Sequence, residues 1–161
     1  MIHTVKKLTH RFLPPAFGLS LKKKIRKDVC FLEGCEYNID KDQTDINKIW
    51  GVGFIPHHHV HSARFGWAWN LDKKMVEVHA YWYDKGQRKS EWISDVNRGE
   101  IVRLELDIHR DHYIFAVRHR YGRYRYTLCK VTPSFKWIGY KLGPYFGGNR
   151  TAPHDMKLLI K

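Results

Sequence analysis

Alternation of apolar and polar residues with a period of two is the feature that most constrains this chain. Successive side chains of a strand point to opposite faces, so a strict alternation predicts one buried and one solvated face. Residues 101–108 alternate in this way, with Val102, Leu104, Leu106 and Ile108 as the apolar set. Residues 75–83, 88–96, 112–120 and 123–130 are further predicted strands, separated by turn sequences such as Asp84-Lys85-Gly86. Short strands at this spacing predict an all-β fold, an antiparallel sandwich or barrel.

The size and aromatic content of the chain predict one folded domain. It has 161 residues, and 14% of them are aromatic, which is enough large apolar surface for a single hydrophobic core. Residues 1–27 carry lysines and arginines but no acidic residue. We therefore expect a basic N-terminal arm over residues 1–27 and a single β-sandwich domain over residues 28–161.

The chain is strongly basic, with 29 Lys and Arg against 16 Asp and Glu, a net charge of +13. Acidic residues are also missing between His112 and His154. A positive field attracts phosphates, sulfates or uronic carboxylates. We expect a small anionic ligand or an acidic glycan as partner, and nucleic acid remains a possible partner although no recognised nucleic-acid-binding module is present.

Hydropathy and cysteine content bear on the compartment. No segment approaches the roughly 18 to 20 apolar residues that a membrane helix needs, and no apolar run follows the basic start as in a secretion signal. Cys30, Cys35 and Cys129 are an odd number and do not form a disulfide framework or a zinc knuckle. We expect a cytoplasmic protein with reduced thiols and no membrane partner.

The run from Lys136 to Ile160 carries a family resemblance. It is expected to form an aromatic strand through Tyr145-Phe146-Gly147-Gly148, then a loop with Pro153, then an apolar final strand. This order resembles the closing strands of concanavalin A-like lectin/glucanase sandwiches, a group that includes laminin-G-like modules and several polysaccharide lyases. The resemblance implies a two-sheet jelly roll whose concave sheet binds sugars in relatives. It leaves the ligand open, because a fold does not dictate a function.

A histidine-rich segment before residue 70 is the first candidate site. If a strand runs from His59 to Trp69, His59 and His61 share one face at a spacing that suits zinc, but the roughly four ligands of a closed site are not completed. We therefore predict no metal and no cofactor. Neutral imidazoles and a guanidinium can donate to anionic oxygens, and an indole offers a stacking surface. The predicted ligand-binding residues here are His57, His58, His59, His61, Arg64, Trp67 and Trp69.

Two further segments are candidate sites. On the hairpin around Tyr121-Gly122, arginines and tyrosines alternate, and Arg118 and Arg120 are expected to point to one face, where they can grip one anion. In the second segment, Gly147-Gly148 allows a ligand to approach the backbone closely. The residues predicted to bind ligand in these segments are Arg118, His119, Arg120, Tyr145, Asn149 and Arg150.

Motifs for catalysis are missing, which directs the functional prediction. The chain has no phosphate loop, dinucleotide fingerprint, nucleophile elbow or metalloprotease motif, and no catalytic residue is assigned. We predict a non-catalytic protein that captures a small anionic ligand, such as a nucleotide or nucleotide-derived signal, for example as a viral anti-defence sponge. The alternatives are a carbohydrate-binding lectin-like module, nucleic-acid binding through the basic surface, or a polysaccharide lyase acting on an acidic glycan. A lyase needs a base and a partner for a uronate carboxylate, roles open to Tyr145, His119 and Arg64.

Overall fold

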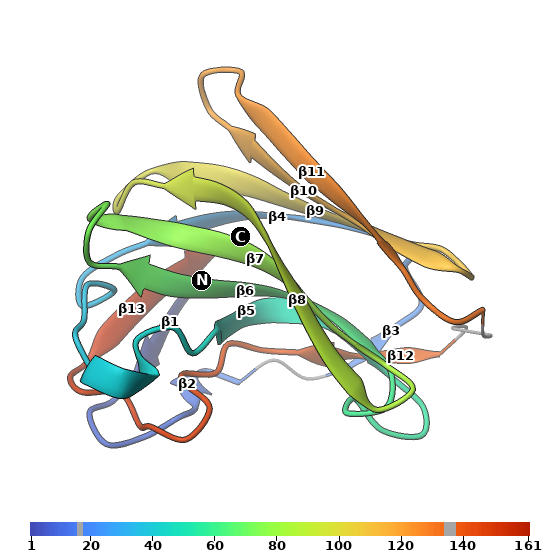
Figure 1. The fold of residues 1–161 in the computed structure, drawn as a ribbon, viewed down its shortest axis with the longest axis horizontal. Helices are drawn as coiled ribbons and strands as arrows, with labels where there is room; N and C mark the ends of the chain where they lie inside the picture. Colours follow the sequence, from blue (N-terminus) through green and yellow to red (C-terminus); the bar gives the residue numbers. More distant parts are fainter. Residues whose placement is uncertain (16–17, 134–137) are drawn as a thin grey trace.

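Strands dominate the structure. The computed structural model describes residues 1–15, 18–133 and 138–161, and every regular element within them is a strand except the short 3₁₀ helix η1 (Asp40–Asp42). The strands form two antiparallel sheets (Figure 1). This arrangement confirms the predicted all-β sandwich of two antiparallel sheets.

Among the described residues, sheet A has seven strands and sheet B has six. In spatial order, sheet A contains β11 (Tyr124–Lys130), β10 (His112–His119), β9 (Ile101–Ile108), β4 (Lys24–Phe31), β13 (Met156–Ile160), β1 (Ile2–Val5) and β2 (Phe12–Leu13). Sheet B contains β3 (Leu19–Ser20), β12 (Gly139–Leu142), β5 (Asn47–Phe54), β6 (Ser62–Asn70), β7 (Met75–Asp84) and β8 (Gln87–Val96). Residues 136–137 of the run that carries the family resemblance lie outside the described residues.

The core lies between the inner faces of the two sheets. Phe65 on β6 makes an edge contact with Phe115 on β10, with ring centroids 5.1 Å apart, and Trp67 contacts Phe31 on β4 at 5.4 Å. All four of these side chains are fully buried. Because alternate residues of β6 point into the core, the residues between them, including Arg64, must point to the outer face of sheet B.

Residues 1–15 and 18–27 belong to the sandwich, which corrects the prediction of a separate basic arm. Strand β1 pairs with β13 on one side and β2 on the other, and Val5 and Phe12 are buried in the core. Strand β4 crosses the predicted boundary, because its residues on both sides of position 27 pair with β9. The charge pattern concealed these short strands, since their few apolar residues stand among exposed lysines and arginines.

The described cysteines are free thiols. Cys30, Cys35 and Cys129 are buried, and burial raises the pKa of Cys35 and Cys129 to about 12. Both thiols are therefore protonated at neutral pH and pack as small apolar groups. Within the described parts of the chain, no helix is long and apolar enough to cross a membrane.

Candidate functional site

The outer face of sheet B brings polar side chains together in rows across the strands. The register places Gly51 of β5 opposite Arg64 of β6, and Arg64 opposite Tyr81 of β7. In the neighbouring row, Tyr140 of β12 lies opposite Gly53 of β5. Gly53 lies opposite Ser62 of β6, and Ser62 lies opposite Tyr83 of β7. A guanidinium and several phenols thus share one face of a sheet whose other face forms the core.

Arg64 lies at the centre of this face. Its Nη2 donates to the carbonyl oxygen of Gly143 at 2.8 Å, whereas its buried Nε has no hydrogen-bond partner among the described residues. Burial lowers the pKa of Arg64 to about 10, and nearby phenols oppose that shift. The guanidinium therefore stays charged at neutral pH and keeps a donor free. The phenols that act on it are those of Tyr81, Tyr83, Tyr140 and Tyr145.

Glycines in β5 make room for this arrangement. A Cβ at Gly51 would lie 2.7 Å from Cγ of Arg64, and a Cβ at Gly53 would lie 2.7 Å from the ring of Tyr140. Contacts that short are not tolerated between carbon atoms, so both positions require glycine for the observed packing. The side chains of Arg64 and Tyr140 can therefore lie across the backbone of β5.

Lys48, Arg88 and the carboxylate of Asp45 line a small hollow near Arg64. Its volume is about 240 Å³, and Lys48, Tyr81, Arg88 and Ser90 are among the residues that line it. The Lys48 Nζ lies 4.7 Å from the centre of the Tyr81 ring. Burial, together with the charges of Arg64 and Arg88, lowers the pKa of Lys48 to about 8, while burial raises the pKa of Tyr81 to about 12. Cations that repel one another here would each be stabilised by an incoming anion.

Three histidine rings gather on the loop between β5 and β6. The rings of His57 and His58 are 4.3 Å apart, and His59 lies 4.3 Å from His58. The backbone N–H of His58 donates to the Tyr140 hydroxyl at 2.8 Å, and its Nδ1 is 3.0 Å from the same oxygen. Burial lowers the pKa of His58 to about 4 and also lowers that of His59. This loop therefore adds neutral imidazoles to one end of the outer face.

The sequence predicted that His59 and His61 share one face of a strand, and the structure corrects this. Strand β6 begins at Ser62, so both histidines precede it and follow the loop instead of the strand. The Nδ1 of His61 lies 3.9 Å from Oδ1 of Asp84. The expected pair of histidines at strand spacing is therefore not formed.

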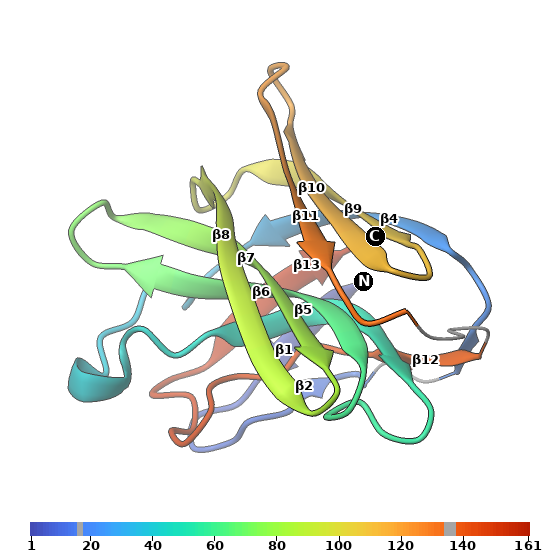
Figure 2. The ribbon, with the colours of Figure 1, turned by 45° about the vertical axis from the view of Figure 1, so that its right-hand side comes forward.

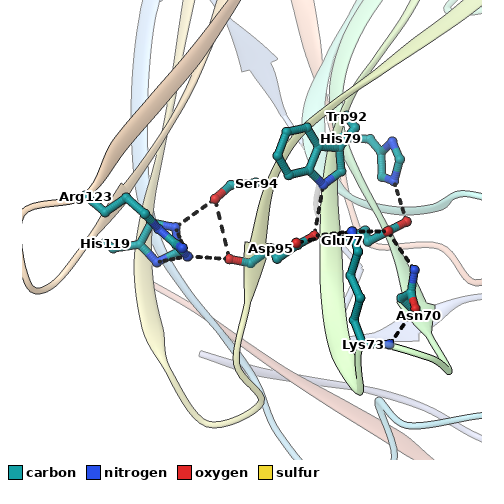
Figure 3. Close-up of polar contacts among 9 residues, drawn as sticks. All are labelled: Asn70, Lys73, Glu77, His79, Trp92, Ser94, Asp95, His119 and Arg123. Atoms are coloured by element: carbon teal, nitrogen blue, oxygen red, sulfur yellow. Dashed lines mark hydrogen bonds and ion pairs between the residues drawn. The ribbon is translucent and has the colours of Figure 1, made fainter.

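Trp92 forms an exposed platform at the other end of the outer face. Its indole is 45% exposed, and its Nε1 donates to Oδ1 of Asp95 at 2.9 Å. Figure 3 shows that Lys73 also reaches Asp95 and Glu77, and its Nζ lies 5.7 Å from the Trp92 ring. These contacts fix the orientation of the ring. A hollow of about 450 Å³ lies beside it, lined by Trp92, His79, Ser90 and other residues.

Trp67 and Trp69 do not lie on this face, which corrects the prediction that they stack a ligand. Both point into the core, with exposures of 0% and 7%. Their strand has two faces, and the sequence pattern correctly separated them, but the aromatic face is the one that packs against sheet A. Arg64, on the opposite face, keeps its predicted position at a candidate site.

The predicted arginine hairpin lies on sheet A. Arg118 pairs with Glu105 on the neighbouring strand at 3.4 Å and covers the Tyr124 ring, and Arg120 follows the end of β10, in the turn. In both views this turn projects beyond the rest of the sandwich (Figure 1, Figure 2). His119 is buried and contacts Ser94 and Glu100 at 2.9 and 2.6 Å. The three residues therefore do not converge with Arg64, and Arg118 and Arg120 do not share one strand face.

The three predicted residues beside Gly147-Gly148 lie in two different parts of the structure. Tyr145 joins the outer face of sheet B, where its backbone pairs with Lys48 and its ring stacks on His10 at 5.1 Å. Asn149 and Arg150 lie on an exposed loop, and Nε of Arg150 is 2.7 Å from Oδ2 of Asp42. Tyr145 alone of these three predicted residues contributes to the Arg64 site.

Sequence reasoning missed several members of the outer face. Residues 75–83 were identified as a strand, and their alternation of Val76, Val78 and Ala80 with polar and aromatic residues is the signal that separates the two faces. The same separation in β8 places Trp92 opposite His79. The missed residues are Lys48, Tyr81, Tyr83, Arg88, Trp92 and Tyr140.

Comparisons with known proteins support the fold. No protein-family model and no curated protein sequence matches this chain. Among solved structures, the alginate lyase from Klebsiella pneumoniae aligns with a TM-score of 0.63 and 8% identity, over 86% of this chain and 58% of the lyase. A xylan β-1,4-xylosidase from Bacillus halodurans C-125 aligns with a TM-score of 0.52 and 10% identity, over 99% of this chain and 32% of that chain. The chain thus spans less than two thirds of either protein, and at these identities the likeness establishes a shared jelly-roll β-sandwich fold.

Proposed function

We propose that the outer face of sheet B binds an acidic polysaccharide and that Arg64 pairs with the carboxylate of a uronic acid residue. The observation that carries this proposal is the half-buried Arg64 side chain, whose buried Nε has no partner among the described residues. Burying a donor without a partner costs free energy, and a carboxylate can accept from a guanidinium through two parallel hydrogen bonds. A uronate carboxylate would therefore satisfy Arg64 and fix the orientation of its sugar ring.

The extent of the face favours an oligosaccharide over a single small ion. Ser90 lines both the hollow beside Lys48 and the hollow beside Trp92, so the two hollows adjoin. Two cations, Lys48 and Arg88, against one carboxylate, Asp45, leave the first hollow with an excess of positive charge that suits acidic groups. The apolar face of a sugar can stack on the fixed Trp92 ring. The likeness to an alginate lyase is consistent with this proposal, since alginate is a polymer of uronic acids.

Capture of a nucleotide receives less support from the site. Phosphate groups are commonly held by several backbone N–H groups at a helix N-terminus or in a glycine-rich loop. On the outer face of sheet B, the groups that can donate hydrogen bonds to an anion are the side chains of Arg64, Lys48 and Arg88. A guanidinium fork can pair with the single carboxylate of a uronate through two hydrogen bonds.

The experiment that tests the proposal is titration calorimetry with a matched pair of oligosaccharides. One is an oligouronate such as an alginate hexamer, and the other is the same hexamer with its carboxyl groups chemically reduced to alcohols. We expect the oligouronate to bind and the reduced form to bind at least tenfold more weakly, since a charged hydrogen bond is worth about 1.5 to 3 kcal/mol. Equal binding of both forms, or binding of a nucleotide in place of oligouronates, would contradict the proposal.

Cleavage of the bound polymer by β-elimination is a second candidate, favoured by the phenols around Arg64. Pairing of the carboxylate with Arg64 would acidify the C5 proton of the uronate, and a base would remove it. The electron pair then forms the C4–C5 double bond, the C4–O4 bond breaks, and O4 takes a proton. Because burial raises the pKa of Tyr81 to about 12, Tyr81 is protonated at neutral pH and suits the role of proton donor.

Ultraviolet absorbance of the unsaturated product measures this reaction directly. An increase in absorbance during incubation with alginate, lost in Tyr81→Phe, is the result expected of a lyase that uses Tyr81 as its acid. Binding without any increase in absorbance would leave the carbohydrate-binding function and exclude the lyase for the polymer tested.

The lowered pKa of Lys48 predicts that ligand affinity depends on pH. Its pKa is lowered to about 8, so the free protein loses this charge between pH 7 and pH 9, whereas uronate carboxylates are ionised throughout. An acidic ligand favours the protonated lysine, so affinity should fall as pH rises, by at most about tenfold over this range. Lys48→Arg should remove the decline, because arginine stays charged.

Affinity measured at constant ionic strength from pH 6 to pH 9 checks this expectation. Lys22→Arg is the matched control, since Lys22 lies outside the residues that line either hollow on the outer face of sheet B. An unchanged decline in Lys48→Arg would show that another group controls the pH dependence.

A further inference from the structure

The histidine cluster on the β5–β6 loop has the composition of a metal site. One ligand nitrogen from each of His57, His58 and His59 lies within 4.8 Å of the others, and His57 and His59 are exposed while His58 is half-buried. Imidazole nitrogens are preferred ligands of zinc and of the late first-row transition metals. We infer that these three histidines bind one divalent transition-metal ion of the zinc type, a site that is independent of the proposed glycan binding.

Loop geometry explains how three consecutive side chains can converge. On a strand, neighbouring side chains point to opposite faces, so consecutive histidines would diverge. Here the chain turns back on itself, because the N–H of Val60 donates to the carbonyl oxygen of His57 at 2.8 Å. Both ends of the turn are fixed, since Phe54 N–H donates to the His61 carbonyl at 3.0 Å and Gly86 N–H donates to the Val60 carbonyl at 3.1 Å. The turn therefore supplies a rigid base for the three rings.

Tyr140 supplies the outer contact that metal-binding histidines usually have. When the Nδ1–H of His58 donates to the Tyr140 hydroxyl, 3.0 Å away, Nε2 carries the free lone pair and can bind a metal. The same hydroxyl oxygen accepts from the His58 backbone N–H at 2.8 Å, so the ring is held next to its own backbone. His58 is thus a pre-oriented ligand.

Closing the site requires only rotation of exposed rings. Zinc–nitrogen bonds are about 2.0 to 2.1 Å long, so tetrahedral coordination brings the three nitrogens to roughly 3.3 Å from one another. His57 and His59 are exposed and can rotate toward His58 without disturbing the core. Three protein ligands leave one position for water or another oxygen ligand, as in open zinc sites. This ligand set differs from the His59 and His61 pair considered in the sequence, and it lacks only the fourth ligand.

Calorimetric titration of the untagged protein with Zn²⁺ tests the inference. We expect one ion per chain, and His57→Ala and His59→Ala should each weaken binding by at least about tenfold, since even changes to the outer contacts of metal ligands cost 10- to 100-fold. His61→Ala is the matched control: it lies on the same loop but contacts Asp84, and it should bind zinc as the unchanged protein does. Replacement of exposed histidines leaves the core intact, and thermal unfolding without metal verifies this for each variant.

Cobalt substitution gives a second measurement. Bound Co²⁺ should give the intense visible absorption of a low-coordinate site, and this absorption should disappear in the His57→Ala and His59→Ala variants. A stoichiometry below one ion per chain at saturating zinc, or equal affinity in these variants and in His61→Ala, would overturn the inference. Glycan binding measured after treatment with a chelator separates the two proposals, because we expect it to persist without metal.

Discussion

Replacing Arg64 by lysine is expected to abolish most binding of acidic oligosaccharides while the fold is retained. Lysine keeps the positive charge but lacks the planar fork that pairs with a carboxylate through two hydrogen bonds. Loss of one partner from a desolvated charge pair costs about 2 to 5 kcal/mol, which corresponds to roughly 30-fold to several-thousand-fold weaker binding. Arg64 is such a group, because its Nε is buried and its neighbours on the sheet face are phenols.

Arg118→Lys is the matched control for this experiment. Arg118, like Arg64, lies on a strand, but it is exposed on sheet A, where it covers the Tyr124 ring and pairs with Glu105. Exposed ion pairs contribute roughly 0 to 1 kcal/mol, so the control should change affinity little. Titration calorimetry with an alginate hexamer measures both variants. Loss of binding in Arg118→Lys with binding retained in Arg64→Lys would move the site to the β10–β11 hairpin, where the sequence alone had also placed one.

Two tryptophans should respond to replacement in opposite ways. Trp67→Ala should lower the free energy of unfolding by about 3 to 5 kcal/mol, because the indole is fully buried and contacts Phe31 and Tyr37. Trp92→Ala should leave that free energy nearly unchanged, since the ring is 45% exposed. It should instead weaken oligosaccharide binding by about 0.5 to 1.5 kcal/mol, the usual contribution of ring stacking.

Equilibrium unfolding in urea measures the first effect, and titration calorimetry measures the second. The pair distinguishes a core residue from a ligand platform, because each variant is the control for the other. If Trp67→Ala weakened binding at unchanged stability, the assignment of the two faces of β6 would be wrong. If Trp92→Ala left affinity unchanged, Trp92 would not be part of the binding surface.

The candidate site could be predicted only in part from sequence. Arg64 and the three consecutive histidines were identified because unusual residues are adjacent in the chain. Tyr140 was missed because it lies 82 residues from His58 along the chain. In the structure its hydroxyl contacts His58, and its phenol is one of those that act on the charge of Arg64. Alternation separates the two faces of a strand, but it does not tell which face packs on the other sheet. Trp67 and Trp69 were misassigned because they lie on the face of β6 opposite Arg64, and that aromatic face packs against sheet A.

Sequence by itself determined the class of fold and the strands between residues 75 and 130, because period-two alternation is a local property that each strand carries in its own residues. Only the tertiary structure decided that β1 to β4 complete the sandwich, since β1 is stabilised by its pairing with β13 at the far end of the chain. It also placed Arg64 among tyrosines from β7 and β12 and moved the arginine hairpin to the other sheet. The physical reason is that strand order and register are set by hydrogen bonds and packing between segments distant in sequence, which no local pattern encodes.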